Sequence, residues 1–377
     1  MSGGALADLR IVDFSRVLAG PLATMVLADL GAQVVKVERP GTGDETRRWG
    51  PPYDETGMTT YFQAVNRNKT SVVLDLRAAG DVERARELAA GADVVVENFR
   101  PGVMDGLGLG YERLAADGLR ANRPALVYCS ITGFGSAEGA ALPGYDLLVQ
   151  AVGGLMSITG TPQGEPQKVG VALVDVICGL FASTGILAAL RHRDRTGEGQ
   201  RVQLNLLSCL LAALVNQGSA YTLAGEVAGR LGNAHRSVAP YDLLRAADGE
   251  LVVAVGTDEQ FRALAEVLGC PELAHDEAYR TNAARVGNRD RLREELEARL
   301  GQRPASDWVS ALSAAGVPAG QVNDIAGAFA LAQRLGLDPI VEIPRAGGGA
   351  ARLTRNPIEL SATPAGYHTP PPPLPRP

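Results

Sequence analysis

The sequence predicts an α/β fold in which a large domain with a doubly wound parallel sheet is combined with a smaller α+β domain. Short β-type runs alternate with helical patterns from Leu9 to Ile131, as in sheets of parallel strands. Two long, mostly apolar helical segments follow, and from about Gly225 a hairpin-like pair and further helices replace that pattern. At 377 residues the chain also exceeds the roughly 250–300 residues at which single cores stop growing, so two domains are expected.

The first elements are typical of a βαβ unit. Leu9–Phe14 is a β-type run, and Pro21–Leu30 is predicted as a helix with proline in its first turn. Gly31 suits the position just after a helix, and the next run, AQVVKVE, is typical of a strand. A strand, a helix and a second strand in this order favour parallel pairing.

Further strands are expected at Ser71–Leu76, Asp93–Phe99 and Ala125–Ile131, with helical patterns such as DVERARELAAG between them. In a doubly wound sheet, ligands bind in the crevice beyond the carboxyl ends of the strands. The residues that follow these strands are therefore candidates for a binding site.

Long helices are predicted from Asp175 to about Arg193 and from Val202 to about Leu223, joined by the polar turn DRTGEGQ. The segment YDLLRAADGELVVAVG is hairpin-like, and helices near Glu259–Leu268, Arg289–Leu300 and Ala305–Ala315 complete a small domain. The tail TPPPPLPRP is expected to be extended on the surface. The predicted organisation is a large domain over residues 1–200, a helical linker over 201–225, a small α+β domain over 226–330, and a return to the large domain with the proline-rich tail over 331–377.

Composition excludes several classes of function. The net charge of −6 offers no basic field for nucleic acid, so we expect no nucleic-acid partner. The sequence has no run of about 20 apolar residues and no signal sequence, so we expect no membrane partner and a cytoplasmic location. The cysteines and histidines follow no metal-ligand spacing, so no metal site is expected and the cysteines are interpreted as reduced and structural. These residues are Cys129, Cys178, Cys209, Cys270, His192, His235, His275 and His368.

Asp175 is a single acid within the otherwise apolar or small run GVALVDVICGLFASTGILAAL. Burying an unpaired charge is costly, so the carboxylate needs a structural or a chemical reason. One interpretation is a helix N-cap, because Asp accepts hydrogen bonds from the free N–H groups that open a helix. Those donors and the helix dipole would also keep the carboxylate ionised, as covalent catalysis by a carboxylate requires. The two interpretations are compatible.

The first strand–loop–helix turn, DFSRVLAGPLA, has one glycine where a dinucleotide fingerprint needs three, which disfavours a nicotinamide site. The next strand ends in KVER, which places Lys36 and Arg39 near the crevice. Such cations suit a phosphorylated ligand, although a solvated surface pair is an equally good interpretation. The segments NRNKTS and ENFRPG gather basic and amide side chains at other strand boundaries.

Taken together, long segments of the sequence resemble the family III CoA-transferases, which include formyl-CoA transferase, carnitine CoA-transferase and the α-methylacyl-CoA racemases. The resemblance spans nearly the whole chain and includes DFSRVLAGPLATMVLADLGAQVVKVERPGTGD, ADVVVENFRPGVMDGLGLGY, PGYDLLVQAVGGLMSITG and GVALVDVICGLFASTGILAALRHRDRTGEGQRV. The segment GNAHRSVAPYDLLRAADGELVVAVG is most similar to the succinyl-CoA:glutarate, or dicarboxylate, branch.

The resemblance implies a Rossmann-like large domain, a small domain and an interlocked homodimer with active sites between large and small domains of different subunits. It places the family's nucleophilic aspartate on Asp175 and Tyr145 near the reacting centre. The CoA site that it implies comprises Leu18, Ala19, Arg39, Leu74, Asp75, Leu76, Arg77, Asn98, Phe99 and Arg100. The implied activity moves CoA from an acyl-CoA to a free mono- or dicarboxylic acid through an aspartyl intermediate, with CoA as a substrate and no cofactor or metal.

One departure bears on the reaction. The racemases of the family carry a histidine in the PGYD segment as a proton-transfer group, whereas this chain has Tyr145. A phenol, with a pKa of about 10, is poorly matched to abstracting a proton at neutral pH, so Tyr145 favours CoA transfer over racemisation. An acyl-CoA racemase or epimerase and a non-catalytic CoA-binding protein remain the alternatives.

Overall fold

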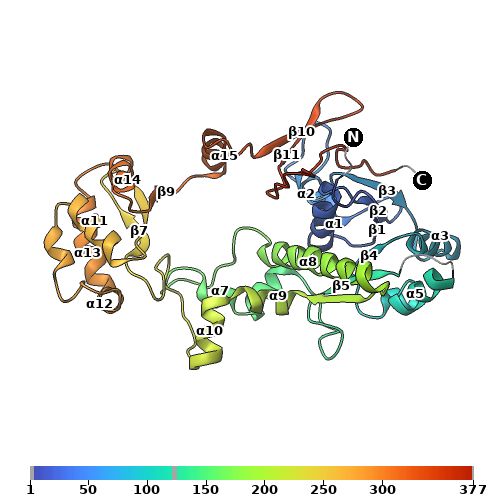
Figure 1. Cartoon of the computed structure of the whole chain (residues 1–377), viewed down its shortest axis with the longest axis horizontal. Helices are drawn as coiled ribbons and strands as arrows, with labels where there is room; N and C mark the ends of the chain where they lie inside the picture. The colour runs from blue at the N-terminus through green and yellow to red at the C-terminus, as the bar shows by residue number, and fades with distance from the viewer. Residues whose placement is uncertain (1–3, 121–124, 376–377) are drawn as a thin grey trace. The chain divides into compact units, whose positions relative to one another are not determined.

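The computed structural model describes residues 4–120 and 125–375 and divides the chain into two compact units (Figure 1). Unit 1 contains the residues up to Leu155, the segment Lys168–Glu226 and the residues from Asp338 onward. Unit 2 contains Met156–Gln167 and Val227–Leu337. The chain therefore crosses between the units more than once, and each unit is assembled from separate segments.

A six-stranded parallel sheet is the centre of unit 1, with strand order β3-β2-β1-β4-β5-β6. The strands are β1 (Arg10–Asp13), β2 (Gln33–Glu38), β3 (Lys69–Val73), β4 (Val94–Glu97), β5 (Val127–Thr132) and β6 (Arg201–Asn205). The order reverses between β1 and β4, where a doubly wound sheet opens its ligand crevice. The predicted α/β fold with a parallel sheet is confirmed.

Helices cover both faces of this sheet because successive side chains of a buried strand point to opposite sides. Ile11 packs in the core on the side of α1 (Ala19–Asp29) and α8 (Leu173–Thr196), whereas Val12 packs in the core on the side of α3 (Ala79–Ala90) and α5 (Tyr111–Arg120). Val94 and Val95 of β4 divide in the same way. Such strands are buried on both sides rather than on alternate residues, and all four residues of β4 are buried.

Helices α1 and α8 lie side by side across unit 1 (Figure 1). At their contact a Cβ atom added to Gly179 of α8 would stand 2.7 Å from the carbonyl oxygen of Ala19 in α1. No side chain fits this approach without a shift of backbone. Since Asp175 lies one helical turn before Gly179, the contact also holds Asp175 near the beginning of α1.

The segment from Val202 to Leu223, expected as one helix within a helical linker over residues 201–225, is not a single helix. It begins in β6 and continues as α9 (Leu206–Ala213) and α10 (Val215–Ala224), which are bent by 85° at the break. Pairing with β5 stabilises the first residues as a strand. Asn205 then starts α9, because its side chain accepts a hydrogen bond from the backbone N–H of Ser208 at 2.8 Å.

Shorter elements complete unit 1: α2 (Thr60–Ala64), α4 (Val103–Gly106), α6 (Asp146–Val152) and the antiparallel pair β10 (Ile340–Pro344) and β11 (Ala350–Thr354). The proline-rich tail has no regular secondary structure over its described residues, but it is not wholly on the surface. Pro371 and Pro372 are buried, and the Arg47 guanidinium donates to the carbonyl oxygen of Pro372 at 3.1 Å. Residues 376–377 of the tail lie outside the described residues.

Unit 2 is the smaller α+β part that the sequence predicts. Its sheet is antiparallel with strand order β7-β8-β9 and packs with helices around one apolar core. Its elements are β7 (Tyr241–Arg245), β8 (Glu250–Ala254), α11 (Asp258–Val267), α12 (Asn282–Gly287), α13 (Arg289–Leu300), α14 (Ala305–Ala314), β9 (Ala319–Gln321) and α15 (Ile325–Arg334). Helix α7 (Leu155–Ile158) lies at the boundary of the two units.

Among the described residues, α8 is the one continuous helix long and apolar enough to cross a membrane by length and composition. Its residues Cys178, Ala182 and Ile186 are instead fully buried in the core of unit 1. A buried core helix passes the same test of length and composition, so this helix is not by itself an indication of a membrane span.

Candidate active site

Two pockets adjoin at the carboxyl ends of the parallel strands in unit 1. Pocket A has a volume of about 200 Å³ and contains Asp175, whereas pocket B has a volume of about 400 Å³ and lies beyond the ends of β2 and β3. Arg16 and Phe99 line both pockets, and the Arg16 guanidinium lies 5.0 Å from the centre of the Phe99 ring. These two residues therefore form the boundary between the pockets.

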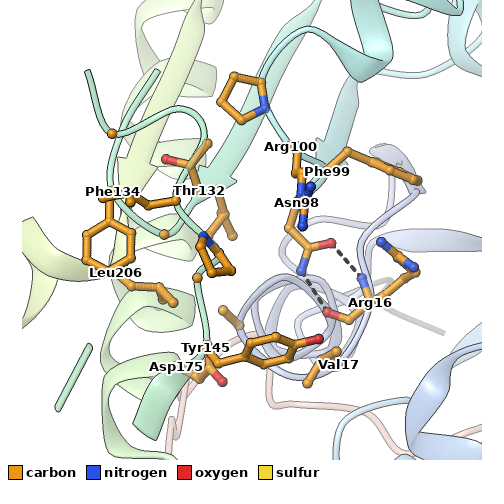
Figure 2. Close-up of a pocket in the computed structure, with 18 of the residues that line it drawn as sticks. Arg16, Val17, Asn98, Phe99, Arg100, Thr132, Phe134, Tyr145, Asp175 and Leu206 are labelled. Carbon is orange, nitrogen blue, oxygen red and sulfur yellow. Dashed lines mark hydrogen bonds between the residues drawn. The ribbon is translucent and has the colours of Figure 1, made fainter. Parts of the chain in front are cut away.

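The structure brings the residues singled out from the sequence to these two pockets. Figure 2 shows Tyr145 and Asp175 together at one end of pocket A, with Arg100 at the other end. Pocket A is lined by Leu18, Ala19, Asn98, Phe99, Arg100, Tyr145 and Asp175, and pocket B is lined by Arg39, Leu74, Asp75, Leu76, Arg77 and Phe99. Their shared location fits one extended ligand, but the binding role of each residue stays a prediction.

Asp175 does not cap its helix, so the capping interpretation is wrong. The N-cap of α8 is Ala172, and Asp175 lies in the first turn. Asp146, at the start of α6, takes the capping role from another part of the chain. Its Oδ2 atom accepts hydrogen bonds from the backbone N–H groups of Val174 at 2.8 Å and of Asp175 at 3.2 Å.

This arrangement also changes the expected charge state of Asp175. Burial, and after it the negative charge of Asp146, together raise the pKa of the Asp175 carboxyl to about 7. The expectation that helix N–H donors would keep the carboxylate ionised is therefore wrong. Asp146 occupies donors that would otherwise stabilise the Asp175 anion.

Asp146 is itself held in place. The side-chain amide of Gln150, one turn along α6 and fully buried, donates to Oδ1 of Asp146 at 2.5 Å. The carbonyl oxygen of the same amide accepts from the backbone N–H of Val169 at 2.9 Å. A partly buried chain of hydrogen bonds thus fixes α6 against the segment that leads into α8.

The loop between β1 and α1 is clamped to the segment after β4. Asn98 accepts from the backbone N–H of Arg16 at 2.9 Å and donates to its carbonyl oxygen at 2.7 Å (Figure 2). The next residue, Val17, has a φ angle of 71°, a left-handed conformation that is strained for a β-branched side chain. Its N–H donates to the carboxylate of Asp44 at 3.3 Å. These contacts hold the strained backbone that leads into α1 at the edge of pocket A.

Of the two cations expected at the crevice, Arg39 and Lys36, one is accessible. Arg39 is half-exposed, and its guanidinium lies 3.2 Å from Oε1 of Glu45, which also pairs with Arg16 at 2.7 Å. Lys36 is fully buried, and its ammonium pairs with Asp44 at 2.9 Å. Lys36 therefore supports the walls of the crevice, whereas Arg39 is placed to meet a ligand.

Sequence reasoning missed several residues in and around pocket A. Asp146 directly follows Tyr145 in the PGYD segment, but nothing in the sequence indicates that Asp146 caps the helix that carries Asp175. Tyr61 is near the same acids: burial, followed by the charges of Asp175 and Asp146, raises the pKa of Tyr61 to about 12. The ring of Tyr61 packs edge-on against Trp49, which lines pocket A. In the sequence, nothing linked Tyr61 and Trp49 to Asp175.

The chemistry available in pocket A is that of a carboxyl group. Asp175 is protonated and ionised to similar extents at neutral pH, and a carboxylate withdrawn from water is a stronger nucleophile than a hydrated one. Among the described residues, no three His, Cys, Asp or Glu side chains are grouped as metal ligands would be.

Comparisons with known proteins agree with this arrangement. The family CoA-transferase family III matches residues 6–376. Succinate–glutarate CoA-transferase of Agrobacterium fabrum is 42% identical over 98% of this chain and 92% of its own length. Succinyl-CoA:glutarate CoA-transferase of Homo sapiens is 41% identical over 97% of this chain and 84% of its own. The crystal structure of a CAIB/BAIF family protein from Brucella suis superposes with a TM-score of 0.86 at 42% identity, covering 99% of this chain and 97% of that one.

Proposed function

Because the chain belongs to CoA-transferase family III and is an enzyme of that family, we propose that it moves CoA from an acyl-CoA to a small dicarboxylic acid. The observation that carries the proposal is the carboxyl of Asp175, half-buried in pocket A with a pKa of about 7. The names of the relatives support a dicarboxylate as the acceptor. CoA is a substrate in this proposal, and no other cofactor or metal takes part.

CoA is proposed to lie across both pockets. Its phosphates would meet Arg39 and Arg77 at pocket B, where both guanidinium groups reach solvent. Its thioester would enter pocket A beside Asp175 and Tyr145. Support for one continuous site comes from Phe99, which lines both pockets.

The proposed reaction exchanges one thioester for another. The ionised carboxylate of Asp175 attacks the donor thioester, which forms a mixed anhydride and releases CoA thiolate. The thiolate attacks the aspartyl carbonyl, which gives an aspartyl thioester and releases the donor acid. The acceptor carboxylate then displaces the thiolate to form a second mixed anhydride, and thiolate attack on its acyl carbonyl yields the new acyl-CoA and restores Asp175. Each reactive bond is made as another is broken, so no ATP is consumed.

Negative charge develops on the carbonyl oxygen in each of these steps. Leu18 and Ala19 line pocket A at the beginning of α1, and no side chain caps this helix. Its first backbone N–H groups are therefore suited to stabilise such an oxyanion.

We further propose that the active enzyme is a homodimer. Helices α8 to α10 expose large apolar side chains that a folded single chain leaves in water, and such patches mark interaction surfaces. They are Leu180, Phe181, Leu187, Leu211, Val215, Tyr221 and Leu223. Sedimentation of the chain at decreasing concentration tests this: a folded, active monomer would contradict it.

An isotope experiment separates transfer from the alternatives. With an acyl-CoA and a labelled free dicarboxylic acid, we expect label to enter the CoA ester, and we expect no solvent deuterium at the α-carbon of a 2-methylacyl-CoA. Deuterium incorporation without acid exchange would support a racemase instead. In that case a group other than Tyr145 would have to transfer the α-proton. Binding of CoA with neither reaction would support a non-catalytic binding protein.

A further inference from the structure

Unit 2 contains a pocket of its own, pocket C, with a volume of about 300 Å³. Its walls come from β7, α13, the segment 231–241 and the residues Thr161 and Pro162, all within unit 2. Most of the lining is apolar, including Pro162, Val238, Pro240, Leu292 and Leu296. Pocket C therefore offers a short hydrocarbon chain a surface that excludes water.

Arg289 gives pocket C an unused hydrogen-bond donor. Its Nη2 donates to the carbonyl oxygen of Arg236 at 2.9 Å, and its Nε donates to the carbonyl oxygen of Val286 at 3.4 Å. Its Nη1 is buried and has no hydrogen-bond partner. A buried guanidinium N–H without an acceptor is unfavourable. Because Nη1 has almost no accessible surface, an anionic oxygen of a ligand would meet it after a small rotation of the Arg289 side chain and would gain a charge-assisted bond.

His235 supplies a second donor to the same lining. Its Nδ1 accepts a hydrogen bond from the backbone N–H of Ser237 at 3.1 Å, so in the neutral ring the proton is on Nε2. The ring is held against Tyr241, with centroids 5.3 Å apart. The orientation of the imidazole is thus fixed by the protein, and its Nε2–H remains for a ligand.

The other charged groups of pocket C are either paired with one another or exposed to water. Asp242 is neutralised by an ion pair with Arg293 at 2.8 Å, and Arg293 in turn also bonds Glu297 at 3.1 Å. Asp290 is exposed at the first turn of α13, where water screens its charge. Arg289 is therefore the cation that remains available in this lining.

We propose that pocket C binds a small aliphatic carboxylate, with its carboxylate on Arg289 and His235 and its hydrocarbon chain against the apolar walls. An inorganic anion would use the donors but not the walls, so the lining favours the organic acid. The inference does not depend on the proposed function, because binding is measured without turnover.

The test uses the full chain carrying Asp175→Asn, which prevents covalent chemistry, with glutarate, acetate and inorganic phosphate as probes. Nitrogen NMR of the histidine rings reports on pocket C alone, with exposed His192 as an internal reference. We expect glutarate to shift the Nε2 signal of His235 saturably and phosphate to do so at least about tenfold more weakly. No shift at high glutarate, or an equal response to phosphate, would overturn the proposal.

Variants locate the site. Arg289→Ala should weaken the His235 response about tenfold or more, which corresponds to loss of one charged hydrogen bond, and Arg289→Lys should restore part of it. Arg262→Ala, which removes an exposed arginine of α11 paired with Glu259, is the matched control and should change nothing. Equal effects of the two alanine variants would contradict the assignment. If Arg289→Ala does not fold, the titrations of the chain that retains Arg289 with glutarate, acetate and phosphate still test whether pocket C binds a carboxylate.

Discussion

The carboxylate of Asp146 accepts a hydrogen bond from the backbone N–H of Asp175, with 3.2 Å between Oδ2 and the nitrogen. Two acids thus meet at the beginning of α8 with different tasks. Asp146 caps the helix, whereas the Asp175 carboxyl is left without that cap and has a raised pKa. A carboxyl whose pKa is raised by burial and by a neighbouring acid is typical of catalytic sites.

The first prediction is an acid limb near pH 7. If ionised Asp175 is the nucleophile, kcat/KM should fall about tenfold per pH unit below the pKa of about 7 and level off above it. The measurement is CoA transfer between pH 5.5 and 9 with saturating acceptor acid. A profile that stays flat down to pH 5.5, as the usual aspartate pKa of about 4 would give, would contradict a buried nucleophile.

The second prediction concerns Asp146→Asn. The amide keeps an oxygen that can cap α8 but removes the negative charge, so the pKa of Asp175 should fall and the acid limb should move to lower pH. Asp146→Ala should in addition cost about 1 kcal/mol of stability, since the cap is lost. Comparing the pH profiles and urea unfolding of both variants separates the charge from the cap. An unmoved limb in the asparagine variant would argue against coupling of the two acids.

The sequence predicted most of the parallel sheet because its strands are short apolar runs separated by clear helical patterns and turn residues. The first strand, expected at Leu9–Phe14, is β1 at Arg10–Asp13, and Arg289–Leu300 is α13 with the predicted bounds. The segment after Val202 was misassigned because an apolar stretch fits both periods. Only its pairing with β5, set by the tertiary fold, decides that it starts as a strand.

The residues of the candidate site could be found from motifs, but their interactions could not. Asp146 and Asp175 are separated by 29 positions, and no local pattern indicates that one caps the helix of the other. Lys36 was expected near the crevice, either at a ligand or in a solvated surface pair. Its buried pairing with Asp44 depends on how the loop after β2 folds back. Residue types are therefore readable from the sequence, whereas pKa values and partners need the fold.

The third prediction is that Arg39→Ala raises the KM for acyl-CoA and leaves kcat nearly unchanged. A phosphate contact far from the thioester stabilises ground and transition states equally, so the KM for acyl-CoA should rise about tenfold while kcat changes little. Arg48→Ala, at a nearby exposed position that lines neither pocket, is the control. Steady-state kinetics with varied acyl-CoA give both constants. A collapse of kcat at unchanged KM would instead place Arg39 at the reacting centre.

The fourth prediction is that Asp175→Asn abolishes activity but raises stability above neutral pH. Transfer should be abolished, because the amide is no nucleophile. The folded protein holds a proton on Asp175 between about pH 4 and pH 7, where the unfolded chain releases it, so stability declines across this range as pH rises.

The variant lacks that penalty, so its Tm should exceed that of the unmodified chain at pH 8 and match it near pH 4. The gain should be about 1–2 °C for each kcal/mol recovered. Thermal unfolding at the two pH values measures it, and a Tm difference that does not grow with pH would show that Asp175 is not the group responsible.

The fifth prediction is that Gly179→Ala disturbs the site from within the core. The new Cβ would lie 2.7 Å from the carbonyl oxygen of Ala19, so α1 and α8 must separate and Asp175 must move with its helix. Overpacking of this kind costs about 1–3 kcal/mol, and a displaced nucleophile should lower kcat more than it changes the KM for acyl-CoA.

Gly80→Ala is the matched control, since Gly80 is exposed in the first turn of α3 with no atom near the added Cβ. Alanine should be neutral or slightly stabilising there. Urea unfolding and steady-state kinetics of the two variants decide the matter: if Gly179→Ala behaved like Gly80→Ala, the close approach of α1 and α8 would not be what positions Asp175.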